Sequence, residues 1–188
     1  MKDRVYKDCV QCKALLDNGD RCRNKTCTYP TYCWIHTKAK VGVKIKKSTI
    51  PGAGMGLFAT KEFRSREKIC DYGGKLMSKE MSDKIDSGYA VGVSDGKVRD
   101  SASTQAGIGR YANTCRTKNK REKDCKGNNA ELVESSMGRR VHIETIDNKR
   151  IKKGDEVLVR YGRGYWKDYD KMVKQKKRRA TKRKKKHG

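Results

Sequence analysis

Apolar and polar residues alternate with a period of two in several short segments of the chain. Val41, Val43 and Ile45 alternate with glycine and lysine, and segment 140–146 repeats the pattern. This period places successive side chains on opposite faces of an extended chain, so it predicts strands. By the same pattern, or by short apolar runs that turn residues bound, we expect further strands at 57–59, 68–72, 89–93, 98–100, 129–133 and 156–161.

The segments between the expected strands carry turn and helix signals. Pro51 and Gly52 mark one turn, and Asp95 with Gly96 is a hairpin signal. Segment 78–86 is polar with two apolar residues four apart, which predicts a short helix capped by Ser78. Segment 116–126 is highly charged and is expected to be a surface loop. Many short strands with few helices predict a mainly β domain.

The length and charge of the chain narrow its class. A chain of 188 residues suits one main domain with small appendages. The formal net charge is +26, and segment 171–188 contributes 11 Lys or Arg without an acid, which leaves +15 on the rest. Such a charge favours polyanions and predicts contact with nucleic acid or chromatin. The alternative is a basic protein whose charge only keeps it in solution.

The distribution of apolar residues indicates the compartment. No apolar run approaches the roughly 18 residues that span a bilayer, so we expect no membrane segment. The first residues are charged and lack the apolar core of a signal peptide, which predicts an intracellular protein. Disulfides are rare in that compartment, so the eight cysteines are expected to be metal ligands or free thiols.

Five of the cysteines and one histidine gather in the first forty residues. Cys12, Cys22, Cys33 and His36 make a four-ligand set suited to tetrahedral zinc. A segment this short buries little core, so a metal would have to hold it together. The pattern resembles small Cys/His motifs that bind structural zinc. Cys9 and Cys27 are alternative ligands, and the competing interpretation is a disordered basic arm with incidental cysteines.

Further along the chain, six short motifs occur in a distinctive order. They are Gly-Met-Gly-Leu-Phe-Ala at 54–59, Asp-Tyr-Gly-Gly at 71–74, a tyrosine followed by Val-Arg-Asp-Ser at 89–101, Arg-Tyr-Ala-Asn-Thr-Cys at 110–115, Asn-Ala at 129–130, and Gly-Asp-Glu-Val-Leu followed by tyrosine at 154–161. Together they resemble, over 41–166, the SET domain of protein lysine methyltransferases. The resemblance implies a knotted β fold of short sheets with few helices, S-adenosylmethionine as cofactor, and methyl transfer to a lysine amine.

The resemblance also implies roles for individual residues. Tyr161 would be the catalytic tyrosine, and Tyr72 would line the same lysine channel. The residues implied in cofactor binding are Gly54, Met55, Gly56, Tyr89, Asn113, Thr114 and Trp166. On residue type alone, each tyrosine could equally be an ordinary core residue, and Asn113 could cap a turn.

Two departures from the family pattern stand out. Thr114 replaces the usual histidine after the asparagine, which changes local contacts. No cysteine follows Cys125, so the zinc cluster that often follows this domain is absent from the sequence and Trp166 with the tail would have to close the channel.

The expected organisation has three parts: a Cys/His zinc-binding motif at 1–40, a SET methyltransferase domain at 41–168 and a basic tail at 169–188. The expected substrate is a lysine of a histone tail or another protein, and the expected cofactors are S-adenosylmethionine and structural zinc. Basic runs at 176–179 and 182–186 predict a nuclear location and contact with nucleosomal DNA. The alternative is a nucleic-acid-binding protein with an inactive SET-like scaffold.

Overall fold

The structure is a computed structural model of the whole chain. It describes residues 10–26, 31–85, 88–102, 106–115, 127–135 and 140–161, with the side chain of residue 34 excepted. The charged segment 116–126 and the basic tail therefore lie outside the described residues. No helix in these ranges is long and apolar enough to cross a lipid bilayer.

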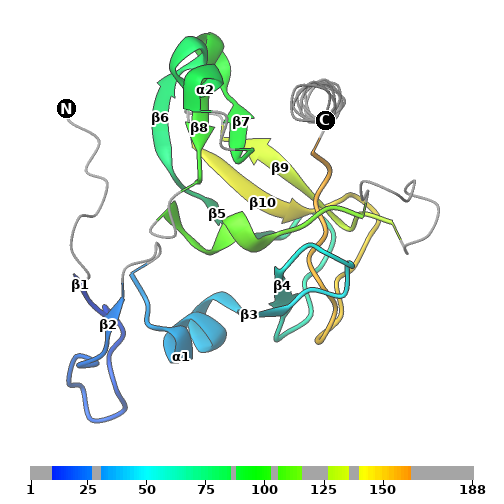
Figure 1. The fold of residues 1–188 in the computed structure, drawn as a ribbon. Coiled ribbons are helices and arrows are strands. Elements are labelled where there is room, and N and C mark those ends of the chain that lie inside the picture. The colour runs from blue at the N-terminus through cyan, green and yellow to red at the C-terminus, as the bar shows by residue number, and fades with distance from the viewer. Residues whose placement is uncertain are drawn as a thin grey trace, which may run out of the picture.

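Four small antiparallel sheets make up most of the described chain (Figure 1). Two are strand pairs and two have three strands, in the orders β5-β10-β9 and β6-β8-β7. The strands are β1 (Val10–Gln11), β2 (Lys25–Thr26), β3 (Val43–Lys47), β4 (Met55–Ala59), β5 (Lys68–Tyr72), β6 (Lys75–Ser78), β7 (Ala90–Gly92), β8 (Lys97–Asp100), β9 (Ala130–Glu134) and β10 (Val141–Thr145). This arrangement confirms the mainly β class.

The helices are short, as predicted. They are α1 (Trp34–His36), the π-helix η1 (Thr37–Val41), α2 (Lys79–Ile85) and the 3-10 turns η2 (Ser94–Gly96) and η4 (Ile108–Tyr111). The expected cap is present at α2, where the amide of Met81 donates to the Ser78 hydroxyl at 3.3 Å. The sequence pattern did not predict α1, η1 or the strand β6.

The three-stranded sheet β5-β10-β9 lies at the centre of the molecule (Figure 1). The alternation in 140–146 works as predicted, because Val141, Ile143 and Thr145 are buried while His142 and Glu144 are less so. Side chains of this sheet join those of β3 and β4 in one hydrophobic core. Its most enclosed members include Leu57, Phe63, Ile143, Ile151, Val157 and Val159.

Segment 156–161 was expected to be a strand, and that prediction is wrong, because the segment forms only isolated β-bridges. The segment makes single bridges to three separate partners: Glu156 to Phe58, Leu158 to Asn113 and Val159 to Ala130. Its backbone changes partner every one or two residues, so no continuous ladder develops. Its backbone bonds to Leu57 of β4 on one side and to Asn113 and Ala130 on the other.

The N-terminal segment forms a small unit beside the main core. In Figure 1 the pair β1–β2 and α1 lie below and to one side of the central sheet. Cys12, Ala14, Cys22 and Cys33 make a separate buried cluster there. The π-helix η1 ends at Gly42, whose φ of 83° turns the chain into β3.

Candidate active site and metal centre

Two predicted cofactor-binding segments, 54–56 and 113–114, lie side by side although 58 residues separate them. The side-chain nitrogen Nδ2 of Asn113 donates to the carbonyl of Met55 at 3.0 Å and to Oε1 of Glu156 at 3.2 Å. Met55 opens β4 and is 47% exposed, so this junction reaches the surface. The structure thus brings Asn113 onto the Gly-x-Gly segment.

Gly56 is required at this junction for a steric reason. A Cβ at this position would overlap Oε1 of Glu156 and crowd the ring of Phe58. The carboxylate of Glu156 in turn accepts from Ser48 Oγ at 2.6 Å and from the amide and hydroxyl of Thr49 at 2.8 and 2.5 Å. The absence of a side chain at Gly56 therefore lets a buried acid join the end of β3 to the site.

Thr114 stands where the family usually has histidine, and its side chain faces the interior. It is buried, and its hydroxyl lies 3.4 Å from Oδ1 of Asn128. The same oxygen accepts the amide of Cys115 at 2.9 Å. The side chain of Thr114 therefore packs inside the protein.

Tyr72 and Tyr89, which the sequence assigned to catalysis and cofactor binding, are directly connected. The Tyr72 hydroxyl donates to the backbone carbonyl of Tyr89 at 2.9 Å. Tyr72 ends β5 and is buried, and this burial raises the pKa of its phenol well above the usual range. Burial therefore favours the neutral phenol of Tyr72.

Tyr161 approaches the same core from the C-terminal side. Its hydroxyl donates to the carbonyl of Ala112 at 3.0 Å, one residue before Asn113. Tyr161 packs against the core cluster that contains Tyr72. The structure therefore places Tyr161 beside the asparagine segment, and both tyrosines lie on one apolar cluster.

Three expected residues lie outside the described part of the chain, and the sequence patterns missed one residue of the site, Glu156. Trp166 lies outside the described residues, as do the alternative metal ligands Cys9 and Cys27. The sequence patterns gave Glu156 no role, although it lies within a quoted motif. The available signal was an acidic residue directly before a buried apolar run, in a domain that also carries a Gly-x-Gly segment.

The four predicted metal ligands come together in the N-terminal unit. The Sγ atoms of Cys12, Cys22 and Cys33 and a ring nitrogen of His36 all lie within 4.8 Å of one another. His36 Nδ1 is 3.5 Å from Cys12 Sγ and 3.2 Å from Cys33 Sγ. Ligands at zinc bond lengths in a tetrahedron are separated by about 3.6 Å. The donor set and its spacing therefore fit a structural zinc ion.

Neighbouring groups support these sulfurs. The Cys33 amide donates to Cys12 Sγ at 3.2 Å, and Asn24 Nδ2 donates to Cys33 Sγ at 3.6 Å. Burial raises the pKa of the Cys33 thiol, but hydrogen bonds with the backbone and side chain of His36 and with Asn24 outweigh it and lower the pKa to about 6. Thiolates are the form that binds metal.

Of the remaining described cysteines, one is a free thiol and the other is disulfide-bonded. Cys70 is a free buried thiol in β5, and burial raises its pKa to about 12. Cys115 is disulfide-bonded. The expectation that cysteines outside the metal cluster are free thiols therefore holds for Cys70 and is wrong for Cys115.

Comparisons with known proteins identify the family of the chain. A model of the SET domain family matches residues 54–162, more than half of the chain. The chain belongs to the SET domain family. Among solved structures, it is similar to the methyltransferase domain of human PR domain-containing protein 2, at 20% identity and a TM-score of 0.47, over 64% of this chain and 77% of that chain. No curated protein matches the sequence.

Membership of the SET domain family sets the general class of chemistry. SET domains are typical of protein-lysine methyltransferases that use S-adenosylmethionine. The matched range includes the Gly-x-Gly segment, Asn113, Tyr72, Tyr89 and Tyr161. It excludes the Cys/His unit, which precedes it as a separate element.

Proposed function

We propose that this SET domain protein transfers a methyl group from S-adenosylmethionine to a lysine side chain of another protein. The observation that carries the proposal is the convergence at Asn113. Its side chain contacts the Met55 carbonyl, and its preceding residue accepts the Tyr161 hydroxyl. Residues from three distant motifs thus meet where a cofactor and a lysine would have to meet.

The cofactor would be held largely by backbone and by one side-chain amide. Gly54, Met55 and Gly56 would bind its amino-acid end, together with Asn113. The backbone of Thr114, with Tyr89 and Trp166, would contact the remainder. When bound, S-adenosylmethionine supplies an electrophilic methyl group on a sulfonium. Carbonyl oxygens and an amide oxygen accept hydrogen bonds, and aromatic faces attract cations, so these groups suit a ligand that carries positive charge.

The protein must present the lysine as a neutral amine. The reference pKa of lysine is about 10.4, so an amine at neutral pH is mostly protonated. An apolar site lined by Tyr72 and Tyr161 disfavours the ammonium and favours loss of its proton to solvent before attack. The Tyr161 hydroxyl donates to Ala112, so its oxygen lone pairs would accept from the amine and orient it. Positioning in line then supplies most of the rate.

A histone tail in chromatin is the substrate that we favour within this class. A free histone tail is cationic, and so is this protein, so direct attraction between them is poor. A nucleosome removes that difficulty because its DNA attracts the basic regions. We therefore also propose a nuclear, chromatin-associated location, with the tail at 169–188 as an additional DNA tether.

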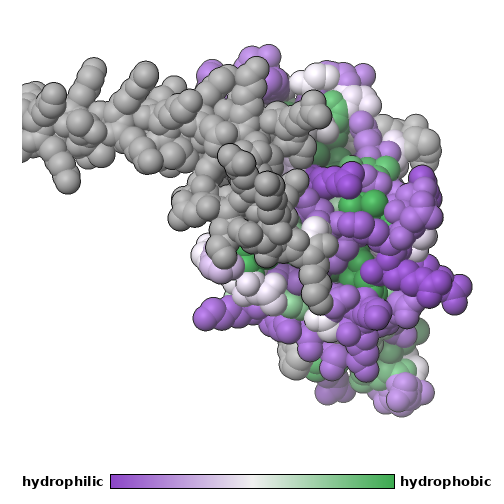
Figure 2. Space-filling view, turned by 90° about the vertical axis from the view of Figure 1, so that its right-hand side faces the viewer, coloured by the Kyte–Doolittle hydropathy of each residue, from purple (hydrophilic) through white to green (hydrophobic). Residues whose placement is uncertain are grey.

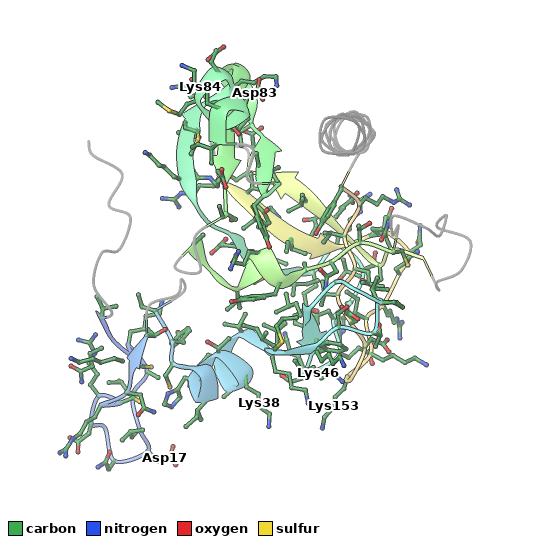
Figure 3. All side chains as sticks on the ribbon, in the orientation of Figure 1. Asp17, Lys38, Lys46, Asp83, Lys84 and Lys153 are labelled. Carbon is green, nitrogen blue, oxygen red and sulfur yellow. The ribbon has the colours of Figure 1, made fainter. Side chains whose placement is uncertain are left out.

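One basic surface on the described chain suits this contact. Segment 37–47 carries five lysines and no acid. Figure 3 shows Lys38, Lys46 and Lys153 projecting from the same side of the molecule, below β3. All three are exposed. Figure 2 shows hydrophilic residues over much of another face, broken by small apolar areas.

We assign zinc a structural role in this proposal. The four ligands of Cys12, Cys22, Cys33 and His36 complete a tetrahedral set, which leaves no position for a substrate. We keep the division into a zinc motif at 1–40, a SET domain at 41–168 and a tail at 169–188. The zinc unit would present basic side chains and would not take part in methyl transfer.

The charge of the chain also supports a second candidate, a nucleic-acid-binding protein with an inactive SET scaffold. Cofactor binding separates the two. Addition of S-adenosylmethionine or S-adenosylhomocysteine should raise the melting temperature of the methyltransferase in a dose-dependent manner, because a ligand that binds only the folded state stabilises it. No shift with either ligand, together with tight DNA binding, would favour the scaffold.

A further inference from the structure

The guanidinium of Arg110 is held in place by two backbone carbonyls and two aromatic rings. Its Nε donates to the carbonyl of Ser101 and its Nη2 to the carbonyl of Ala102, each at 3.0 Å. Its Cζ atom lies 4.6 Å from the ring centroid of Tyr89 and 5.3 Å from that of Tyr111. Hydrogen bonds along one edge and rings against the faces fix the orientation of this planar group.

The other edge of the same guanidinium has no partner among the described residues. A guanidinium carries five N–H donors, and the two carbonyls use one each, which leaves three. The free donors lie on Nη1 and Nη2, the end that can bind both oxygens of one carboxylate. No ion pair within the described ranges includes Arg110. The carboxylate of Asp100, next to these carbonyls, accepts the amide of Ala102 at 2.8 Å.

Arg110 lies beside the two tyrosines of the candidate site. The carbonyl of Tyr89 accepts the Tyr72 hydroxyl at 2.9 Å and the Ser101 amide at 3.2 Å. Burial is the main cause that raises the pKa of Tyr72, and the charge of Arg110 acts on the same phenol in the opposite direction. Tyr89 is 38% exposed and Arg110 is only partly buried, so this edge of the site reaches the surface. A substrate whose lysine enters beside Tyr72 would therefore pass close to Arg110.

We propose that Arg110 is a specificity-determining residue that binds the carboxylate of an aspartate or glutamate near the target lysine of the substrate. Its fixed guanidinium loses little side-chain entropy on binding, and its free N–H donors match the geometry of a carboxylate. This inference rests on the proposed methyltransferase function and deepens it, because it adds a sequence preference to the substrate class. Among the many lysines of a basic substrate, one with a neighbouring acid would be selected.

The test is a competition between synthetic peptides that each carry one central lysine. Matched pairs place glutamate or glutamine at one of the three positions on either side of the lysine. Mass spectrometry measures methyl transfer from S-adenosylmethionine to both members of a pair in one reaction. The wild type should favour glutamate about tenfold in kcat/KM at one or two positions, as a hydrogen bond to a charged group implies. Arg110→Gln should reduce this preference to within about twofold, and partial loss of folded enzyme would not alter the ratio.

Arg21 offers a matched control. Its Nε and Nη2 donate to the carbonyls of Cys12 and Gln11, each at 2.9 Å, so it makes the same pair of contacts within the Cys/His unit. Arg21→Gln should therefore leave the preference for glutamate unchanged. Arg110→Glu reverses the charge and should favour the glutamine peptide.

Two results would overturn the inference: equal turnover of both peptides by the wild type at every position, or a preference that Arg110→Gln retains. Should Arg110→Gln not fold, Arg110→Lys decides. Lysine keeps the charge but cannot hold both carbonyls and a carboxylate, so the preference should fall about threefold or more, and an unchanged preference contradicts the inference.

If only nucleosomes accept the methyl group, the position of the modified lysine decides. An aspartate or glutamate within about four residues of it, with weaker labelling by Arg110→Gln than by Arg21→Gln, supports the inference. A modified lysine without such a neighbour, labelled equally by both variants, contradicts it. Cofactor-dependent label on no peptide and no protein contradicts the proposed function itself, which separates the two failures.

Discussion

At the scale of single residues, the close contacts around Gly56 and Glu156 predict that a side chain added at position 56 destabilises the fold. Gly56 faces the carboxylate that joins Ser48, Thr49 and Asn113. The sequence motif indicated that glycine matters here because a ligand could lie against the backbone, and the structure adds a second reason. Gly56 makes room for the side chain of Glu156.

The substitution Gly56→Ala tests this packing. The new methyl would push Glu156 from its donors, and we expect the free energy of unfolding to fall by about 1–3 kcal/mol, as for overpacked interiors. Chemical denaturation measures the change. Gly92→Ala is the matched control, because a Cβ there meets nothing within 4 Å and its φ is not positive. Equal effects of the two substitutions would contradict the account.

At the scale of elements, a carboxylate after β10 joins that strand to the turn before β5. Asp147 accepts from Arg66 Nη2 at 2.9 Å and from the Ser65 hydroxyl at 3.0 Å. The hydrogen bond with Arg66 is the main cause that lowers the pKa of Asp147 from its ordinary value of 3.8 to about 2. Because this carboxyl is acidified by folding, its stabilisation is complete above pH 3.8 and is lost as the pH falls through 2.

We therefore expect Asp147→Asn to be less stable than the wild type at pH 7, with the difference shrinking between about pH 4 and pH 2. The pair is exposed, so the effect should be small. Denaturation at a series of pH values measures it. Arg66→Gln removes the same interaction and should show the same pH dependence. A difference that grows as the pH falls would disprove the assignment.

The Cys/His unit is a second element whose stability can be tested separately. We expect one zinc ion per chain, released by a thiol-modifying reagent and detected with a colorimetric chelator, because binding and folding of such a unit are coupled. Cys33→Ser should lose the zinc. Cys70→Ser removes a buried thiol outside the cluster and should keep it. Zinc retained by Cys33→Ser would show that other ligands hold the ion.

The sequence predicted elements well where one local pattern decides the structure. The period of two in 140–146 predicted β10, and Ser78 with a polar segment predicted α2. Segment 156–161 failed as a strand because its partners come from three distant parts of the chain. No local pattern encodes contacts with three such distant partners.

In the candidate site, too, the sequence predicted residues that belong to local motifs but not the contacts between distant segments. Motif order predicted Asn113 and Tyr161, and the structure shows what each contacts. The bond from Asn113 to Met55 and the role of Glu156 depend on contacts across 58 and 43 residues, which composition and spacing do not reveal. The disulfide at Cys115 was missed because the expected compartment argued against it.

At the scale of the whole molecule, three exposed lysines project from one side of the described chain. Lys38, Lys46 and Lys153 project below β3, whereas Lys84 lies at the opposite end on α2 (Figure 3). Charge placed in this way would orient the protein on DNA and not only raise its solubility. Such an orientation would favour the nucleosome that we propose as substrate over a free peptide.

Salt dependence of DNA binding tests that arrangement. Replacing Lys38, Lys46 and Lys153 together by glutamine should reduce the slope of log K against log salt by up to about 0.9 for each DNA phosphate that is no longer neutralised. Lys84→Gln is the control and should leave the slope unchanged. Fluorescence anisotropy with a short duplex measures both. An unchanged slope in the triple variant would move the DNA-binding surface elsewhere, for example to the basic tail.

The most direct test of the central claim is transfer of radiolabelled methyl from S-adenosylmethionine to nucleosomes, free histones and the protein itself. We predict label on a histone, more on nucleosomes than on free histones, and its loss in Tyr161→Phe with cofactor binding retained. Phenylalanine keeps the ring that packs on the core and removes only the hydroxyl that donates to Ala112, so the variant should fold. Cofactor-dependent label on no protein at all would contradict the account.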